Sequence, residues 1–519
     1  MPRWFNIAGP CFPSQHFMIP VARRAVEVVE LLEQGRWFSL VSGRQTGKTT
    51  VVQSLAEELT ARGDRLVLWV DLETARGLDD PALAFREILL SVERTLRRDV
   101  PSLPLPSAED VHRWLEAPTS ALLNYLGAIC TTSDRPVVLL LDEADVLTGS
   151  AMVSFLTQLR AMYLARAKSP APWSAVLIGV RAVRDYVAGD DARRTVPWLG
   201  SASPFNVTVE NVTLAAFTAA EVAELTAQHT AETGQRFEDE ANALIWELSQ
   251  GHPWLVNALA DQATRRDVKD RTVPITREHI ERAKEALILE RRTHIDSLLA
   301  RLREDRVRRV LDPMLAGETV PAGSIDDDLA YVANLSLIRL VNGTWQVASP
   351  IYREVIPRAL TWGTQTSLHQ QTGWYLRPDG MLDVPKLMAA WQTFWRKDGH
   401  LDAGGFSYKE SGPHLMLMAF LQRVVNGGGR IDREYALGKG ALDLLLTWKT
   451  QRIPIEVKLR RDTETEDEAL DQVRGYLDAL GLREGWLVIF DLRSTAPWSE
   501  RIFLRTLQRG DCTIHVVGC

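Results

Sequence analysis

The stretch SGRQTGKTT (42–50) decides the fold of the first half of this 519-residue chain. An apolar run, WFSLVS (37–42), precedes it and predicts a β-strand, while residues 48–62 predict a helix that ends at Gly63. A strand, a turn and a helix N-terminus in this order form a phosphate-binding loop, because exposed amides and the helix dipole favour an anion. Ser42 stands where this motif usually has its first glycine, and we expect Gly43 to supply the missing flexibility.

The chemistry of this loop predicts a site for ATP and Mg²⁺. Gly47 lets the backbone approach a phosphate, Lys48 brings positive charge to the β- and γ-phosphates, and Thr49 offers a hydroxyl to Mg²⁺. The predicted nucleotide-binding residues are Gly43, Arg44, Gln45, Thr46, Gly47, Lys48, Thr49, Thr50 and Asp142.

A second motif, LLLDEAD (139–145), completes the predicted ATP site. Its apolar strand ends at Asp142, which can hold the water shell of Mg²⁺ together with Thr49. Glu143 follows at the exposed tip and is the predicted catalytic residue, since a carboxylate there can polarise the attacking water. The motif follows the loop by about 90 residues, with one strand between, which is the order expected of a nucleotide hydrolase.

The remaining apolar runs of this half predict a doubly wound parallel sheet, because short buried strands alternate with helices. They are RLVLWVDL (65–72), PVVLLLD (136–142), SAVLIGV (174–180) and PFNVTV (204–209). Arg181 and Arg184 follow the third run. One of them could contact the γ-phosphate or a neighbouring subunit; the alternative is that each is a surface arginine. Residues 218–262 predict a helical lid, and within them GHPWLVNALA (251–260) has Pro253 at a permitted first-turn position.

Residues 300–360 predict a winged helix. The helical stretch VRRVLDPMLAG (307–317) is followed by a hairpin signal at Asn342–Gly343, the strongest two-residue turn signal in a sequence. Such a module either contacts DNA or braces the ATPase. The polar segment TWGTQTSLHQQTG (361–373) is the predicted linker to a separate domain.

A second constellation of residues lies in the last third of the chain. ALDLLL and IPIEVKL predict two strands, the first with Asp443 and the second with Glu456 and Lys458 on one face. If these strands pair, the two carboxylates converge on one divalent cation, to which the Val457 carbonyl can add a ligand. Lys458 can then stabilise charge that develops on a phosphodiester.

Flanking helices extend this predicted site. The helix at 408–425 has Glu410 near its start as an extra metal ligand, with Glu434 as the alternative. In DQVRGYLDALG (471–481), Gln472 and Tyr476 lie one helical turn apart and can face the same site. The predicted catalytic residues are Glu143, Asp443, Glu456, Lys458 and Gln472; the predicted metal ligands are Thr49, Asp142, Glu410, Asp443, Glu456 and Val457.

Two resemblances follow from these motifs. FNIAGPC (5–11), the loop at 43–50, LLLDEAD and the Gly-x-Pro segment at 251–253 resemble the bacterial AAA-like ATPases near the STAND and archaeal-ATPase group, over residues 1–360. That resemblance implies ATP-dependent conformational switching, sometimes with homo-oligomerisation. The Asp…Glu-x-Lys strands and the Gln-x₃-Tyr helix resemble the RecB-like PD-(D/E)XK nucleases, which implies a Mg²⁺- or Mn²⁺-dependent nuclease that acts on DNA.

Together these observations predict an α/β fold class: a P-loop parallel-sheet ATPase core with a helical lid and a winged helix, then a separate α/β restriction-endonuclease-like domain. The predicted boundaries are 1–211 for the core, 212–299 for the lid, 300–360 for the winged helix, 361–373 for the linker and 374–519 for the nuclease-like domain.

Composition narrows the function classes. The formal net charge of −7 provides no general basic field, so contact with nucleic acid must come from local patches. The four cysteines are far apart and no apolar run is long enough to span a bilayer, so we expect a reduced, cytoplasmic protein without a membrane segment.

The function predicted from the sequence is an ATP-regulated, metal-dependent nuclease that acts on DNA, in bacterial defence or control of mobile elements. One alternative is a STAND-like sensor whose nuclease-like domain only binds nucleic acid or a partner; the intact Asp443, Glu456 and Lys458 argue against it. Another is an ATP-driven translocase or loader of nucleic acid.

Overall fold

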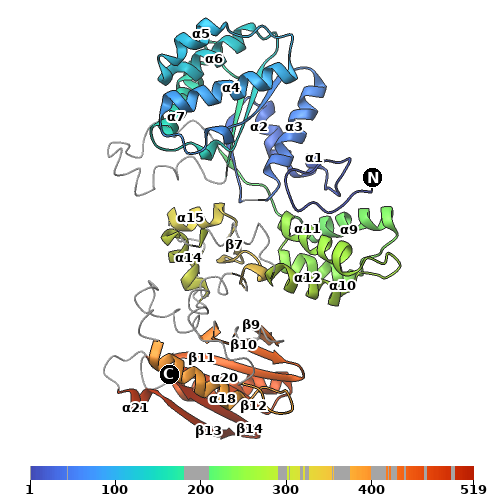
Figure 1. Cartoon of the computed structure of the whole chain (residues 1–519), viewed down its shortest axis with the longest axis vertical. Helices are drawn as coiled ribbons and strands as arrows, with labels where there is room; N and C mark the ends of the chain where they lie inside the picture. Colours follow the sequence, from blue (N-terminus) through green and yellow to red (C-terminus); the bar gives the residue numbers. More distant parts are fainter. Residues whose placement is uncertain are drawn as a thin grey trace. The chain divides into compact units, whose positions relative to one another are not determined.

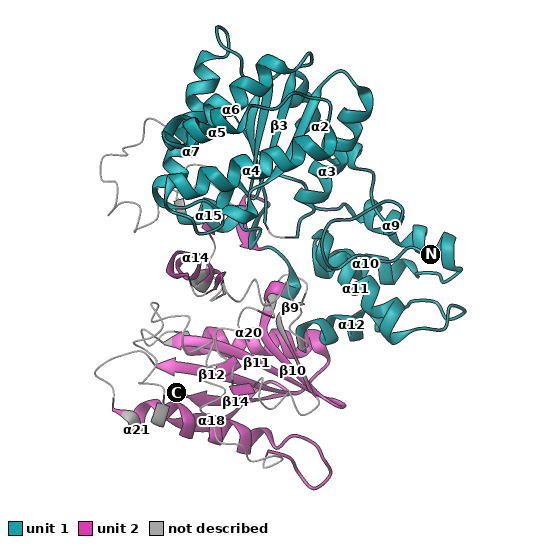
Figure 2. Cartoon of the chain, turned by 45° about the horizontal axis from the view of Figure 1, so that its top comes forward, with its two compact units in different colours: residues 1–297, 323–341, 348–351 teal, residues 298–322, 342–347, 352–519 magenta. Residues whose placement is uncertain are grey.

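The computed structural model describes most of the chain and divides it into two compact units (Figure 2). The first comprises residues 1–297, 323–341 and 348–351, and the second comprises residues 298–322, 342–347 and 352–519. The described residues are 2–43, 45–179, 210–289, 301–302, 304–315, 320–321, 327–353, 355, 375–398, 417–418, 420–421, 429–437, 440–460, 465–491 and 497–519. Arg44, Arg181, Arg184, the strand predicted at 204–209, the linker predicted at 361–373 and Glu410 lie outside them.

A five-stranded parallel sheet forms the centre of the first unit, which confirms the predicted parallel-sheet core. The order is β2-β3-β4-β1-β5, so β4 lies between the strand that leads into the phosphate loop and the strand that ends in Asp142. The strands are β1 (Trp37–Val41), β2 (Leu66–Asp71), β3 (Val137–Asp142), β4 (Ser174–Gly179) and β5 (Asn211–Val212).

Helices cover both faces of this sheet (Figure 1). Phe38 and Leu40 of β1 pack with α2 and α3 on one face, while Trp37 packs with α4, α6 and α7 on the other. Burial on both faces explains why these strands are apolar at nearly every position. The helices are α1 (Val21–Arg24), α2 (Val26–Glu33), α3 (Lys48–Arg62), α4 (Pro81–Asp99), α5 (Ala108–Leu115), α6 (Pro118–Thr132) and α7 (Gly149–Ala165), with short 3₁₀ turns at η1 (Glu73–Ala75) and η2 (Ala144–Val146).

A group of helices follows the sheet in the first unit, so the residues predicted to form a lid are helical, while their role as a lid stays a prediction (Figure 1). The first begins with a capping box between Thr218 and Glu221, and Pro253 occupies the first turn of α11. Gly251, with φ of 76°, leaves no space for a side chain, because a Cβ there would lie 1.9 Å from the Phe217 carbonyl oxygen. The elements are α9 (Ala219–Thr233), α10 (Asp239–Ser249), α11 (Pro253–Asp261), the π-helical η4 (Gln262–Asp267) and α12 (Arg277–Leu289).

A small three-stranded sheet with the order β6-β8-β7 occupies the predicted winged-helix region. Asn342 and Gly343 have φ of 48° and 79°, which is the left-handed pair that a type I′ hairpin turn requires. The winged-helix boundaries stay a prediction. The elements are α14 (Asp305–Leu315), β6 (Val320–Pro321), α15 (Asp327–Asn334), β7 (Ile338–Val341) and β8 (Thr344–Val347).

The second unit contains a six-stranded mixed sheet with the order β13-β14-β12-β11-β10-β9. Strands β9, β10 and β11 form an antiparallel meander, and α20 connects β11 to its parallel neighbour β12. Residues of α18 pack on one face of the sheet and residues of α20 pack on the other. The elements are α18 (Val384–Asp398), β9 (Gly429–Leu437), β10 (Gly440–Trp448), β11 (Gln451–Arg460), α20 (Thr465–Leu480), β12 (Glu484–Asp491), α21 (Trp498–Arg501), β13 (Phe503–Arg509) and β14 (Cys512–Gly518).

Candidate functional sites

The predicted phosphate loop folds around the ammonium group of Lys48. This buried side chain donates from Nζ to the carbonyl oxygens of Ser42 and Gly43, both at 2.6 Å. Gly47 has φ of 92° and immediately precedes α3, where the helix N-terminus begins. The loop therefore closes on the lysine through backbone oxygens and leads directly into the N-terminus of α3, where the positive end of the helix dipole favours an anion.

Thr49 and Asp142 come together, as the Mg²⁺ prediction requires. The hydroxyl of Thr49 is hydrogen-bonded to the Asp142 carboxylate, which also accepts from the Glu143 amide at 3.0 Å. Burial raises the pKa of Asp142, and these two hydrogen bonds act against that rise. A hydroxyl and a carboxylate at adjacent positions are hard oxygen donors, which suit Mg²⁺.

Glu143 lies at the tip of the strand end in the left-handed conformation, with φ of 53°. Burial, followed by the neighbouring Asp145 and Asp142 carboxylates, raises the pKa of Glu143, which favours a role as a general base. Its Oε2 lies 3.4 Å from Nη2 of Arg76, and Arg76 also binds Glu73 at 2.5 and 2.7 Å. Arg76 could not be predicted from the sequence, because it precedes Glu143 by 67 positions and belongs to no motif.

Gly43 is needed for space, whereas the flexibility that we expected it to supply stays a prediction. Its φ lies outside the left-handed region, and a Cβ on it would lie 2.6 Å from the Leu335 carbonyl oxygen. The Gly43 amide donates to Ser336 Oγ at 3.2 Å. Ser336 has φ of 59° and lies in the turn that follows α15, where the Leu337 amide donates to the carbonyl of Val332. The turn after α15 therefore contacts the start of the phosphate loop.

The N-terminal segment FNIAGPC joins the phosphate loop to the lid. The Cys11 amide donates to Thr50 Oγ1 at 3.0 Å, and Trp254 Nε1 of α11 donates to the Ile7 carbonyl at 2.8 Å. Three motifs that are far apart in the sequence, at 5–11, 43–50 and 251–260, thus meet in the first unit. Of the predicted loop residues, Thr46 also donates to the Gly43 carbonyl at 2.9 Å.

The second predicted site is assembled on neighbouring strands of the second unit. Asp443 of β10 and Glu456 of β11 face each other, since Leu444 pairs with Ile455 in the antiparallel register. The Asp443 amide donates to Glu456 Oε2 at 3.4 Å, and Lys458 Nζ lies 2.8 Å from Glu456 Oε1. The structure therefore brings together the two carboxylates and the lysine that the sequence predicted.

Burial dominates the electrostatics of this acidic site. Glu456 is only 1% exposed; burial, and then the Asp443 charge, raises the pKa of Glu456 to about 7. Burial has the largest single effect on the pKa of Lys458 and lowers it, but the hydrogen bond to Glu456 and the charges of Glu456 and Asp443 together raise the pKa above its ordinary value. The half-buried Asp443 carboxylate and the buried Glu456 carboxylate repel each other, and a bound cation relieves that repulsion.

Helix α20 brings Gln472 and Tyr476 to the same face of the sheet. Gln472 Nε2 donates to the Tyr476 hydroxyl oxygen at 2.7 Å, and the Tyr476 ring packs with Leu442 and Leu445 of β10. Burial raises the pKa of Tyr476, and the Glu456 and Asp443 charges raise it further, which is consistent with a position beside the acids.

Two predicted ligands of this site remain predictions. The Val457 amide donates to Asp443 Oδ2 at 2.8 Å, whereas a metal contact by its carbonyl stays a prediction. Glu410 lies outside the described residues. For the alternative, Glu434, the pairs Leu442–Tyr435 and Leu444–Arg433 place position 434 opposite Asp443 in the β9–β10 register.

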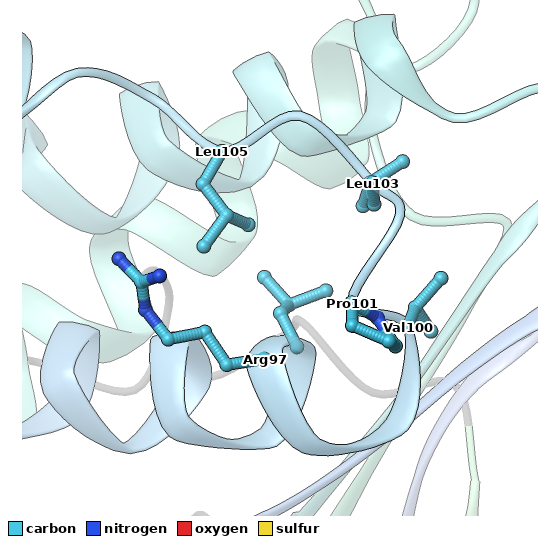
Figure 3. A pocket seen from close by; sticks show the side chains of 6 residues that line it. Arg97, Val100, Pro101, Leu103 and Leu105 are labelled. Carbon is cyan, nitrogen blue, oxygen red and sulfur yellow. The ribbon is translucent and has the colours of Figure 1, made fainter.

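Two other features of the described residues are separate from these sites. A cavity of about 290 Å³ lies at the end of α4, with no P-loop residue in its lining (Figure 3). Its lining residues are Leu96, Arg97, Val100, Pro101, Leu103 and Leu105. An acidic group at Asp478 and Asp511 is neutralised by Arg483, whose Nη1 lies 3.6 and 2.5 Å from these two carboxylates.

Comparisons with known proteins address the two units separately. Residues 19–277 match the AAA-like domain family, and residues 386–494 match a domain family of unknown function (DUF8371). The first unit thus contains an AAA-like, nucleotide-binding P-loop ATPase domain. No curated protein sequence matches the chain. No helix among the described residues combines the length and apolar character needed to cross a bilayer.

Several solved structures are similar to this chain. The Walker-type ATPase PABY2304 of Pyrococcus abyssi is 14% identical, with a TM-score of 0.47, over 68% of this chain and 99% of that chain. The RuvB Holliday junction branch migration motor of Thermotoga maritima is 15% identical, with a TM-score of 0.33, over 64% and 91%. Cdc6p of Pyrobaculum aerophilum is 11% identical, with a TM-score of 0.35, over 66% and 93%.

Proposed function

We propose that this chain is an ATP-regulated, metal-dependent nuclease that acts on DNA. The main support for nuclease activity is that Asp443, Glu456 and Lys458 lie close together on paired strands of the second unit. A buried carboxylate (Glu456) next to a half-buried one (Asp443) is costly to the fold, and a bound divalent cation offsets that cost. The regulation by ATP is assigned to the AAA-like domain, which would bind and hydrolyse ATP.

The residues of the first unit fit ATP hydrolysis with Mg²⁺. Thr49 and Asp142 would hold the cation, and Lys48 would contact the β- and γ-phosphates. Mg²⁺ supplies charge neutralisation of the phosphate oxygens when bound. Glu143 orients the attacking water and accepts its proton, a role that its raised pKa favours.

The residues of the second unit fit phosphodiester cleavage with Mg²⁺ or Mn²⁺. Asp443 and Glu456 would hold the cation, which supplies Lewis acidity when bound. The Lys458 ammonium group, fixed by Glu456 at 2.8 Å, lies where it can stabilise negative charge on a phosphate. Gln472, hydrogen-bonded to Tyr476, positions the substrate or the water beside the acids.

The contact between the phosphate loop and Ser336 supports regulation by ATP. The Gly43 amide donates to Ser336 Oγ. A movement of the loop on nucleotide binding would therefore displace the turn after α15. From Ser336 the chain passes directly into β7 of the first unit and then into the Asn342–Gly343 turn, which belongs to the second unit. A route along the backbone therefore runs from the ATP site towards the nuclease-like unit.

The test of this function is a cleavage assay on the full chain. Supercoiled and linear double-stranded DNA, single-stranded DNA and RNA are each incubated with Mg²⁺ or Mn²⁺, with and without ATP. We expect DNA cleavage that needs the metal and responds to ATP. Glu456→Ala should abolish cleavage, whereas Glu468→Ala, an exposed acid on α20, should cut like the parent. If the parent cuts no substrate with any metal and nucleotide, the proposal is wrong and the second unit has only a binding role.

A further inference from the structure

Arg24, the last residue of α1, lies between the phosphate loop and the start of the lid. Its Nη1 is 3.8 Å from the position that a Cβ on Gly47 would occupy. On its other side, Nη2 donates to the Ala215 carbonyl, and Cζ lies 4.5 Å from the centre of the Phe217 ring. All of these residues belong to the first unit. The guanidinium therefore contacts the segment that leads into α9 and faces the open side of Gly47, the loop residue that precedes α3.

The charge of Arg24 is poorly compensated among the described residues. Burial lowers the pKa of Arg24, and the more distant Glu221 charge only partly opposes this effect. No described carboxylate lies within ion-pair distance of it, whereas the adjacent Arg23 is exposed and paired with Glu224 at 2.5 Å. A guanidinium stays charged in a protein and has several N–H donors, so a partly buried one is stabilised by an anion.

We propose that Arg24 is a nucleotide-binding residue that contacts the phosphates of ATP or ADP alongside Lys48. This inference rests on the proposed ATP-binding function. The guanidinium lies at the loop residue where the backbone turns into α3, which is the anion-binding end of that helix. Bidentate N–H donation from arginine matches the geometry of phosphate oxygens.

The same residue would connect phosphate binding to the lid. Ala215 and Phe217, which contact Arg24, directly precede α9, and the Phe217 amide donates to the Gly251 carbonyl at 2.8 Å. Gly251 in turn begins the Gly-x-Pro segment that opens α11. An arginine that turns towards a phosphate weakens its contacts with this segment, so occupancy of the loop is transmitted to the lid.

Equilibrium binding of adenosine, ADP and ATP to the full chain tests this inference. Arg24→Ala should lower the affinity for ADP and ATP by roughly 10- to 100-fold, which corresponds to the loss of charged hydrogen bonds, and leave adenosine binding unchanged. Arg24→Lys should show a smaller loss. Arg23→Ala is the matched control and should bind all three ligands like the parent, because Arg23 is exposed and points its charge at Glu224.

The outcomes separate this inference from the proposed function. An equal loss for adenosine, ADP and ATP would show that Arg24 only braces the lid, and unchanged ATP affinity would show that it binds no phosphate; either overturns the inference. If the parent binds no ATP, or Lys48→Ala binds it like the parent, the ATP site itself is wrong. Should Arg24→Ala fail to fold, Arg24→Gln keeps a hydrogen-bond donor without the charge and carries the same comparison.

Discussion

The ATP site and the acidic site of this chain are built in opposite ways. The ATP site forms on loops at the carboxyl ends of parallel strands, and its lysine is held by the backbone carbonyls of Ser42 and Gly43. The acidic site forms on the flat of a mixed sheet, and its Lys458 is held by a carboxylate side chain, Glu456. One site therefore depends on the path of a short loop, and the other on the pairing of two strands.

This difference decides how each site tolerates change. A phosphate loop keeps its function as long as its backbone can close, so a serine at the first position is accepted. The acidic site depends on register, because a one-residue slip between β10 and β11 would move Asp443 and Glu456 to opposite faces. Side-chain substitutions should consequently have their largest effects in the second unit.

The largest expected effect is that of Asp443→Ala. This change removes one of the two carboxylate ligands, so DNA cleavage and Mn²⁺ binding should both fall below detection while ATP hydrolysis continues. Cleavage assays, calorimetry with Mn²⁺ and a phosphate-release assay on one preparation measure the three properties. If the variant cleaves at the parental rate, the cleavage site lies elsewhere.

The reciprocal change in the first unit is Glu143→Gln. It keeps Lys48 and the loop that bind phosphates but removes the base, so ATP should bind with parental affinity and hydrolysis should fall by about 10²–10⁴-fold. Lys48→Ala should instead weaken binding itself. Nucleotide binding and turnover measured side by side distinguish the two, and equal ATP affinity for Lys48→Ala and the parent would contradict the P-loop assignment.

At the acidic site, metal binding by the carboxylates and charge stabilisation by Lys458 should likewise be distinguishable by mutation. Lys458→Ala leaves both carboxylates in place, so Mn²⁺ binding should persist while cleavage slows by about 10²–10³-fold, the usual effect of losing one charge-stabilising donor. Calorimetry and a cleavage time course are sufficient measurements. Loss of metal binding in this variant would mean that Lys458 mainly maintains the position of Glu456.

The raised pKa of Glu456 predicts a pH-dependent stability. Its pKa rises from 4.5 to about 7 on folding, so between these values the folded chain binds more protons than the unfolded chain. The free energy of unfolding contributed by this group therefore falls as the pH rises through that window. The Gln side chain of the Glu456→Gln variant cannot ionise. In a metal-free buffer, the melting temperature of the variant should therefore increase relative to that of the parent as the pH rises from about 5 to about 8. A constant difference across this range would contradict the buried-acid assignment.

Contiguous motifs explain what the sequence could predict. The helix at 48–62 has the predicted bounds because the loop fixes its start and Gly63, with φ of 75°, ends it in the left-handed conformation. The pairing of Asp443 with Glu456, 13 positions apart, could also be predicted, since two apolar strands that follow each other closely in the sequence form a hairpin readily.

Contacts between distant segments explain what the sequence could not predict. Ser336 lies 293 positions from Gly43, and nothing in either stretch signals the other. Arg76 reaches Glu143 only because β2 and β3 pair in parallel and end at the same edge. Such contacts are determined by the packing of whole elements. Local hydrophobic periodicity does not predict them.

The smallest expected effect comes from Ser336→Ala. This variant tests whether the turn after α15 holds the phosphate loop. The variant loses one hydrogen bond, from the Gly43 amide to Ser336 Oγ, with a net contribution of about 0.5–1.5 kcal/mol. Hydrogen exchange at the Gly43 amide should therefore speed up by roughly two- to tenfold. Alanine keeps the strain of the left-handed turn, because it has a Cβ as serine does.

Ser336→Asn is the matched control for this small effect, because asparagine tolerates the left-handed conformation and offers a side-chain oxygen to the Gly43 amide. It should restore slow exchange. If Ser336→Ala and the parent exchange alike at Gly43, the turn does not hold the loop. If the exchange changes but the response of DNA cleavage to ATP does not, the turn contacts the loop without transmitting its state, and the regulation must follow another route through the first unit.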